Sequence, residues 1–324
     1  MTRKIATLAL CLFWCAGNLY GEAATAQSFP PRPVRVVVPY TPGGGVDFLA
    51  RVVARKLGEK WSKGVIVENR PGGSTIVGTE YVAKSPPDGT TVLLCTTAFS
   101  VNISLIPKLP YDTLQDFAPV ALAAMAPNVI ISHPSVPAAT LKDLIGYAKA
   151  NPSKLTYGYP GVGTASHLAA ELFKFQAGID AVGVAYKGTQ PMLAALLGGE
   201  INYMLDLTGS LSHVRAGKLR ALAVTSNRRL KSFPEIPTVA ESGLPGYEAI
   251  TWYGFVVRAG TPPEIVDLIS REINEAIKSP DAYDRITSQG IEVLGSTPQE
   301  FDRYIRDEAN KWAKVVREAH ITPE

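Results

Sequence analysis

The feature that most constrains the fold is a strand, a glycine loop and a helix that follow one another near the start of the chain. Residues 36–38 are three valines, a short apolar run typical of a strand covered on both faces. Glycines fill positions 43–45, and residues 48–57 repeat apolar side chains at helical spacing until Gly58 ends the helix. Glycines let a ligand approach the backbone, and the helix points unpaired N–H groups and its positive dipole end into the loop. The pattern predicts an anion site made of backbone, with a plain tight turn as the alternative.

The same pattern returns later in the chain. Residues 155–157 form an expected strand, residues 158–164 a glycine loop, and residues 165–177 a helix whose inner side is expected to include Phe175. Strands and helices alternate between the two units, which favours an α/β architecture with a largely parallel sheet. Ligands of open α/β sheets bind beyond the carboxyl ends of the strands. Two such units therefore predict a clamshell that grips an anion from both sides and buries it by hinge closure.

The N-terminus has the pattern of a targeting signal. Arg3 and Lys4 precede an apolar run at 5–16, which is too short to cross a bilayer, and a small-x-small sequence ends at Ala26. We expect residues 1–26 to be a signal peptide that is cleaved after Ala26 during export to the periplasm.

The length of 324 residues is sufficient for two domains after that cleavage. The strand near residue 128 is expected to cross into a second domain, and the strand at 219–225 to lead back. We predict a discontinuous first domain of residues 27–127 plus 227–324, which includes the C-terminal helices, and a second domain of residues 128–226.

Several functional classes lack their sequence signatures. The net charge of +3 is small and no basic stripe is visible, so no nucleic-acid partner is expected. The first loop lacks the lysine and hydroxyl residue of a nucleotide P-loop, and Phe48 stands where a dinucleotide fingerprint has its third glycine. The sequence contains neither a His-x-x-x-His pair nor a Gly-x-Ser-x-Gly elbow. We therefore expect no metal, no cofactor and no catalytic residues.

Three polar residues near the two units have two interpretations each. His167, in the first turn of the second helix, could donate a hydrogen bond to a carboxylate, or it could bond its own loop. Asp206 ends an apolar strand, where it could accept bonds from a ligand amine or hydroxyl, or from backbone N–H groups of the next turn. Asp47 could face the ligand, or it could complement the dipole at the start of the first helix.

The candidate ligand-binding residues lie in the two units and beyond the ends of neighbouring strands. Residues 96–102 are expected to form a polar loop, in which each hydroxyl could equally be a plain turn residue. The candidates from the first half of the chain are Tyr40, Pro42, Gly43, Gly44, Gly45, Asp47, Ser74, Thr96, Thr97 and Ser100. Those from the second half are Gly163, Thr164, Ser166, His167, Tyr186 and Asp206.

Many ordered motifs along the mature chain resemble one family. They include Val38-Pro39-Tyr40-Thr41-Pro42-Gly43-Gly44-Gly45-Val46-Asp47, Glu68-Asn69-Arg70-Pro71-Gly72-Gly73, Gly161-Val162-Gly163-Thr164-Ala165-Ser166-His167 and Pro237-Thr238-Val239-Ala240-Glu241-Ser242-Gly243. The chain resembles the substrate-binding receptors of tripartite tricarboxylate transporters, also called the Bug family of periplasmic receptors.

The resemblance implies a fold, a ligand class and partners. The implied fold is a two-domain periplasmic-binding-protein clamshell, type II-like, with the ligand cleft between the domains. The implied ligand is a small organic carboxylate, held by backbone amides and ordered waters at the two glycine loops. The implied partners are the large and small membrane permease subunits of such a transporter, and the receptor itself is expected to be a monomer.

Two segments depart from the family pattern. Residues 96–102 stand where many relatives have a histidine and an Asn-Pro pair, and Leu205 stands in place of the more usual phenylalanine before Asp206. Both changes line the expected pocket, so the identity of the ligand is not transferred from relatives. Because no arginine stands in the glycine loops, we expect neutral dipoles and water to bind a mono- or dicarboxylate rather than a tricarboxylate.

Two other functions fit the same clamshell. The first is a sensory receptor that signals to a membrane kinase. The second is a periplasmic enzyme that uses His167 and Asp206 as acid and base. The missing catalytic motifs favour a receptor without enzymatic activity.

Overall fold

The computed structural model describes residues 29–324 apart from 231–232, 319–320 and 323–324. The expected signal peptide and its cleavage site lie outside the described residues. No helix in the described ranges is long and apolar enough to cross a membrane.

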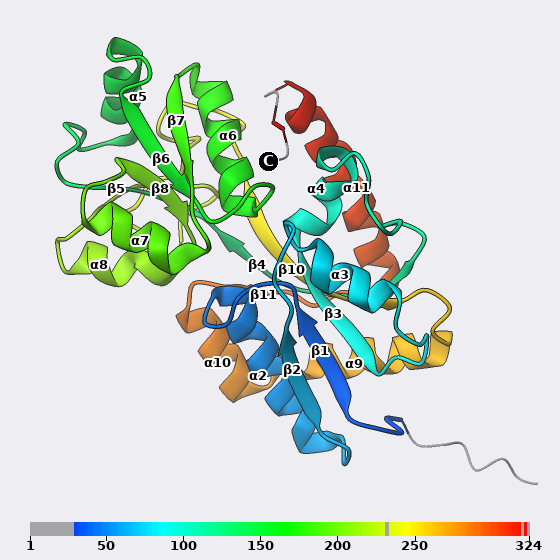
Figure 1. The fold of residues 1–324 in the computed structure, drawn as a ribbon. Helices are drawn as coiled ribbons and strands as arrows, with labels where there is room; N and C mark the ends of the chain where they lie inside the picture. The colour runs from blue at the N-terminus through cyan, green and yellow to red at the C-terminus, as the bar shows by residue number, and fades with distance from the viewer. Residues whose placement is uncertain (1–28, 231–232, 319–320, 323–324) are drawn as a thin grey trace, which may run out of the picture.

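Two mixed β-sheets form the framework of the molecule (Figure 1). The six-stranded sheet has the order β11-β4-β10-β3-β1-β2 and the five-stranded sheet the order β7-β6-β8-β5-β9. The strands of the first are β1 (Val34–Val38), β2 (Val65–Asn69), β3 (Thr91–Thr96), β4 (Phe117–Pro127), β10 (Ile250–Arg258) and β11 (Glu292–Val293). Those of the second are β5 (Val129–Ser132), β6 (Leu155–Tyr159), β7 (Ala181–Ala185), β8 (Tyr203–Asp206) and β9 (Arg220–Val224).

The two sheets have the same strand arrangement. Strands β1, β2 and β3 are parallel, as are β6, β7 and β8, and each trio has a reversed neighbour, β10 or β5. Each reversed strand is the first strand after the chain crosses from the other sheet, because β4 leads to β5 and β9 leads to β10. The prediction of a largely parallel sheet therefore holds for the two trios and is wrong for the reversed strands.

Helices cover both faces of each sheet. In the six-stranded sheet, alternate residues of β1 face opposite ways, so that Val36 packs with α2 on one side and Val37 packs with α3 on the other. The helices on the Val36 side are α2 (Gly45–Lys60), α9 (Pro263–Lys278) and α10 (Pro280–Ser288), and those on the Val37 side are α3 (Ile76–Ala83), α4 (Thr97–Leu105) and α11 (Pro298–Glu318). We call this sheet with its helices the first lobe.

The second lobe is the five-stranded sheet with its own helices. On one face lie α5 (Leu141–Ala150) and α6 (Ala165–Ala177), and on the other lie α7 (Thr189–Leu197) and α8 (Leu211–Arg215), which follows the short helix η1 (Thr208–Ser210). Figure 1 shows this green lobe beside the blue and orange first lobe, with β4 and β10 running toward it.

The C-terminal helix α11 packs on α4 and β4 of the first lobe. Phe301 and Ile305 near its start belong to the core on one face of the first sheet, whereas Trp312 and Val316 belong to a core that contains Val101 and Leu105 of α4 as well as residues of the second lobe. Glu308 lies between them and is buried, and its Oε2 accepts hydrogen bonds from the indole nitrogens of Trp252 at 3.1 Å and Trp312 at 2.8 Å. These bonds fix α11 to β10 of the first sheet.

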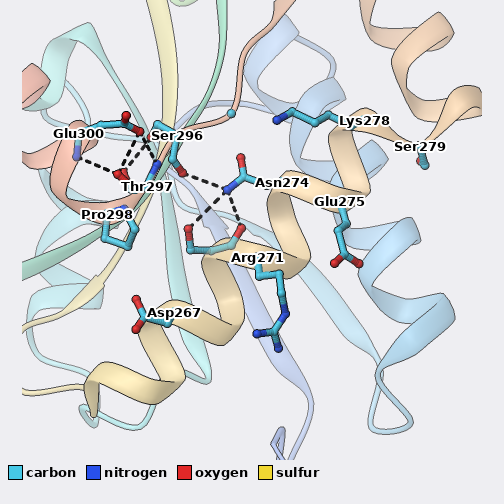
Figure 2. Close-up of a pocket in the computed structure, with 12 residues that line it drawn as sticks. Asp267, Arg271, Asn274, Glu275, Lys278, Ser279, Ser296, Thr297, Pro298 and Glu300 are labelled. Carbon is cyan, nitrogen blue, oxygen red and sulfur yellow. Dashed lines mark hydrogen bonds between the residues drawn. The ribbon is translucent and has the colours of Figure 1, made fainter.

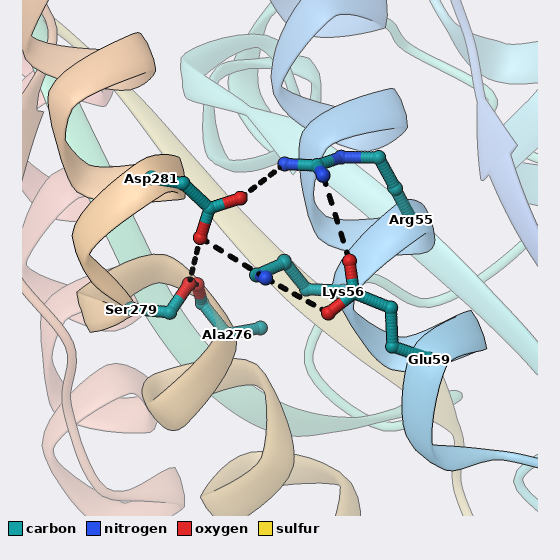
Figure 3. A network of polar contacts seen from close by, with 6 residues as sticks. All are labelled: Arg55, Lys56, Glu59, Ala276, Ser279 and Asp281. Carbon is teal, nitrogen blue, oxygen red and sulfur yellow. Dashed lines mark hydrogen bonds and ion pairs between the residues drawn. The ribbon is translucent and has the colours of Figure 1, made fainter.

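An exposed ion-pair network holds α2 against α9 and α10. Asp281 accepts from Arg55 Nη2 at 2.6 Å and from Lys56 Nζ at 3.0 Å, and Lys56 also pairs with Glu59 (Figure 3). These bonds hold the pKa of Asp281 below its usual value. The network orients the helix whose first turn forms the end of the first glycine loop.

Two local predictions are wrong. Residues 97–102 belong to helix α4 rather than to a polar loop, because apolar and polar side chains alike are buried there against neighbouring elements. Phe175 is 52% exposed, and Phe173 is the aromatic residue on the inner side of α6. Two residues along a helix correspond to about 200°, so a helix that buries Phe173 turns Phe175 outward.

A substitution at Gly254 tests how closely α11 packs on the first sheet. A Cβ at Gly254 would lie 2.0 Å from Cζ of Phe301, so the Gly254→Ala substitution requires the ring and helix to move. We expect the free energy of unfolding in urea to fall by about 1–3 kcal/mol or more.

The matched control is Gly146→Ala, because nothing lies within 4 Å of a Cβ at this exposed position in α5. Alanine is the better helix former by about 1 kcal/mol, so this variant should be as stable as the wild type or more stable. Equal stability of the two variants would contradict the close packing of Phe301 on β10.

Candidate functional site

The glycine loops lie where the two lobes approach each other. A Cβ built on Gly45 in the first loop would lie 3.2 Å from Cδ1 of Leu207, which follows β8 in the second lobe. One built on Gly163 in the second loop would lie 2.7 Å from Cδ2 of Leu105 in α4. One built on Gly188 would lie 3.6 Å from Oγ1 of Thr41. The carboxyl ends of both parallel trios thus face each other where the lobes meet, which is the side on which α/β sheets bind ligands.

The first loop ends in a helix without a side-chain cap. Gly44 is the N-cap residue of α2, and the N–H of Phe48 donates to its carbonyl at 2.9 Å. No side-chain oxygen in the described part of the chain caps the first turn of α2. Pro42, Gly43 and Gly44 are exposed, Gly45 and Val46 are half-buried and Asp47 is buried, so the loop reaches solvent at the point where α2 begins.

Asp47 stabilises the first glycine loop through hydrogen bonds within its own lobe. Its carboxylate accepts bonds from the N–H of Gly43 at 3.0 Å, from Arg51 at 2.9 and 3.0 Å, and from Nδ2 of Asn69 at 2.9 Å. Desolvation raises the pKa of Asp47, but the bonds from Arg51, Gly43 and Asn69 outweigh it and hold the pKa below its usual value. The carboxylate thus has partners within its own lobe, which supports the structural interpretation of Asp47.

The polar residues behind the first loop mostly bond one another. Tyr40 Oη and Thr96 Oγ1 share a hydrogen bond of 2.6 Å at the ends of β1 and β3. Thr97 and Ser100 are fully buried in α4, where the Ser100 hydroxyl donates to the Thr97 carbonyl at 3.0 Å. Ser74 is half-buried, and its carbonyl accepts from Asn102 Nδ2 at 2.9 Å.

The second loop is capped by its own residues. Oγ1 of Thr164 accepts from the N–H of His167 at 3.4 Å and donates to the carbonyl of Gly161 at 2.8 Å. Nδ1 of His167 accepts from the N–H of Gly163 at 3.2 Å, and the ring stacks on Tyr159 with 4.2 Å between centroids. This contact supports the interpretation in which His167 bonds its own loop, and it places the proton of the neutral imidazole on Nε2.

Ser166 connects the second loop to the strand crossings. Its hydroxyl donates to Oδ1 of Asn128 at 3.0 Å, and Asn128 is the single residue between β4 and β5. The N–H of Asn128 donates to Oγ1 of Thr225 at 2.8 Å, and the N–H of Thr225 donates to the carbonyl of Asn128 at 2.9 Å. Thr225 directly follows β9, so these bonds join the two chain crossings.

Asp206 is a buried carboxylate at the end of β8. It is 5% exposed and accepts from the hydroxyl of Ser210, and no cationic side chain in the described ranges forms an ion pair with it. Desolvation raises the pKa of Asp206 from its usual 3.8 to about 6, although bonds from Ser210 and Leu207 lower it. The bonds to the next turn therefore exist, as one of the two interpretations of Asp206 expected.

Tyr186 is the last predicted residue. It is half-buried beyond β7, its backbone N–H donates to the carbonyl of Tyr159 at 2.9 Å, and its ring packs in the second lobe. Asn69, Asn128, Leu207 and Tyr253 also lie beside the two loops and were not predicted. Asn69 had a signal, because it stands in one of the family motifs, whereas Tyr253 lies on a strand that the sequence pattern did not reveal.

The large surface cavities lie away from these residues. One of about 820 Å³ lies between α9 and the start of α11, where Asn274 bonds Ser296 and Thr297 caps the helix together with Glu300 (Figure 2). Another of about 600 Å³ lies between Ser226–Leu230 and α10. Neither is lined by a predicted ligand-binding residue, so the geometry of the helix N-termini, rather than cavity size, identifies the candidate site.

Comparison with known proteins finds one matching family model and several similar proteins and structures. Residues 49–321 match the family model described as tripartite tricarboxylate transporter family receptor. Protein BugT of Bordetella pertussis is 36% identical over 321 residues, which cover 98% of each chain. The structure of R. palustris Rpa4515 with adipate is 36% identical, with a TM-score of 0.86 over 91% of this chain and 100% of that one. The structure of the periplasmic binding protein BugD is 32% identical, with a TM-score of 0.85 over 91% and 100% of the two chains. The predicted clamshell fold is thereby confirmed.

The burial of Asp206 predicts an unusual pH dependence of stability. Because its pKa is higher in the folded than in the unfolded protein, the native state binds more protons between about pH 4 and 6, and stability falls as pH rises through that window. At about 1.4 kcal/mol per pKa unit, Asp206→Asn should gain roughly 3 kcal/mol relative to the wild type between pH 4 and pH 7, measured by urea unfolding.

Asp47→Asn is the matched control, because its stability relative to the wild type should change with pH in the opposite direction. The pKa of Asp47 is lowered, so its charge stabilises the fold at neutral pH, and that contribution is lost as pH falls through the folded pKa. Asp47→Asn should therefore lose stability relative to the wild type as pH rises. A pH-independent difference between Asp206→Asn and the wild type would show that Asp206 is not desolvated.

Proposed function

This chain belongs to the tripartite tricarboxylate transporter family of receptors, and on that premise we propose that it captures a small organic carboxylate between its two lobes. One observation carries the proposal most directly, namely the uncapped first turn of α2 behind the exposed glycines of the first loop. Rpa4515, a relative of the same fold, was solved with adipate. A dicarboxylate is therefore the first ligand class to test.

The first loop supplies the chemistry for binding an anion. The amides of residues 45–47 have no side-chain cap in the described part of the chain, and the positive end of the α2 dipole adds to their attraction for a carboxylate. No arginine or lysine stands in either glycine loop. We propose that neutral dipoles and water hold the carboxylate, which favours mono- and dicarboxylates over tricarboxylates.

Asp206 gives the second lobe a preference for a hydrogen-bond donor on the ligand. Its carboxylate is buried without a cationic partner in the described ranges, so a ligand hydroxyl or amine that donates to it would offset part of the desolvation. We propose this role for Asp206 beside the carboxylate site at α2. The predicted ligand-binding set remains a proposal as a whole, with Thr97 and Ser100 acting through the packing of α4.

Closure of the lobes completes the site. The lobes approach each other at Gly45 and Leu207 and at Gly188 and Thr41, where an added Cβ would meet the opposite lobe. We propose that the bonds between Asn128 and Thr225 lie at the hinge. We propose that the domains divide at this hinge, with residues 27–127 and 227–324 in one and 128–226 in the other.

The cellular role follows from the family. We propose export to the periplasm by the N-terminal signal and delivery of the closed, loaded form to the large and small permease subunits of a tripartite tricarboxylate-type transporter. A sensory receptor would present the same closed form to a membrane kinase. Deletion of the permease genes separates the two, because uptake is lost in the first case and a signal persists in the second.

Gly44 offers a direct test of carboxylate capture. Nothing lies within 4 Å of a Cβ at Gly44, and its backbone is extended, with φ of −85°, so an aspartate fits there and caps α2. The variant Gly44→Asp should fold normally but should lose binding of dicarboxylates such as adipate by at least about a hundredfold, because its charge occupies the anion site. Calorimetric titration and thermal unfolding measure the two effects.

The isosteric variant Gly44→Asn separates charge from shape. It adds the same volume and a similar cap without the negative charge, so it should retain more affinity than Gly44→Asp. In the wild type, a ligand at a hundredfold excess over Kd should stabilise the fold by about 2.7 kcal/mol. If Gly44→Asp binds the ligand as tightly as the wild type does, the anion site is not at this loop.

A further inference from the structure

Tyr253 lies at the candidate site but was not among the predicted residues. It stands on β10, directly opposite Thr96 of β3 in the antiparallel register. Its side chain is fully buried on the same face of the sheet as α2. The strand pairing therefore places the ring behind the first glycine loop, next to the end of β3.

The hydroxyl of Tyr253 points toward the start of α2. A Cβ built on Gly45 would lie 3.4 Å from Tyr253 Oη, and the same point lies 3.2 Å from Cδ1 of Leu207. A side chain at this first residue of the helix would therefore crowd Leu207 and Tyr253. The hydroxyl, the N-terminus of α2 and a residue of the opposite lobe thus meet at one place.

This hydroxyl has no hydrogen-bond partner within the part of the chain that the structure describes. A buried polar group without a partner is costly, and a phenylalanine would fill the same core position without that cost. Burial raises the pKa of Tyr253, and the nearby Tyr40 and Asp206 raise it further, so the group stays protonated and is available as a donor. A group in this state is suited to an acceptor that arrives from outside.

We propose that Tyr253 is a ligand-binding residue whose hydroxyl donates a hydrogen bond to the carboxylate oxygen held at the N-terminus of α2. The inference rests on the proposed function and deepens it, because it adds a side-chain donor to a site otherwise made of backbone. Leu207 covers the same point from the second lobe and excludes water from the bond when the lobes meet. Exclusion of water strengthens a bond to an ionised acceptor.

The test is Tyr253→Phe, which removes only the hydroxyl. Tyr203→Phe is the matched control, because Tyr203 is equally buried, its hydroxyl also lacks a partner within the described ranges, and its ring packs in the core of the second lobe. Titration calorimetry of adipate, malate and the other acids of a mono-, di- and tricarboxylate panel gives Kd, and thermal unfolding without ligand gives Tm.

We expect Tyr253→Phe to raise Kd at least tenfold for each acid that the wild type binds, with a ligand-free Tm equal to or above that of the wild type. Tyr203→Phe should leave Kd within twofold. Unchanged Kd in Tyr253→Phe would overturn the inference while leaving the receptor function intact. A similar loss of affinity in both variants, together with a lower Tm, would assign Tyr253 a structural role and also overturn it. If the wild type binds no acid of the panel, the proposed function fails and the inference with it.

Discussion

An α-helix leaves its first amides without partners inside the helix, and α2 begins at a glycine that has no side chain to supply one. The surrounding structure is arranged around this uncapped turn. Asp47 and Asn69 fix the loop from inside, ion pairs orient the helix against α9 and α10, and the second lobe places Leu207 over the first helical residue. In contrast, α6 begins at Thr164, whose hydroxyl accepts from the N–H of His167 and caps the helix. The two facing loops therefore differ, and the first is the one left open to an anion.

The sequence predicted the parts of the fold that depend on local patterns. The strand, loop and helix at β1 and α2, and again at β6 and α6, follow from valine runs, glycines and helical spacing. Strand β10 was missed because its reversed place between β3 and β4 depends on pairing with residues far away in the chain. Helix α4 was missed because threonines and Asn102 made a buried helix look like a polar loop. Such features arise from tertiary contacts, which no local pattern records.

The candidate site shows the same division. The two glycine loops were found because glycine and helix-start signals are local. Whether Asp47 and His167 face a ligand or their own loops could not be decided from sequence, because both arrangements use the same residue types at the same positions. The structure gives each of them a partner in its own lobe. Tyr253, one of several buried polar groups without a partner in the described residues, lies on the strand that was not predicted.

Helix α11 also bears on how the lobes can move. Two strand crossings alone would allow the lobes to bend and twist in several directions. Helix α11 is packed on α4 and β4, and the indoles of Trp252 and Trp312 share the Glu308 carboxylate, so the helix stiffens the first lobe next to these crossings rather than linking the lobes. Bending between the lobes is then left to the crossings themselves, while the first glycine loop stays on a rigid base.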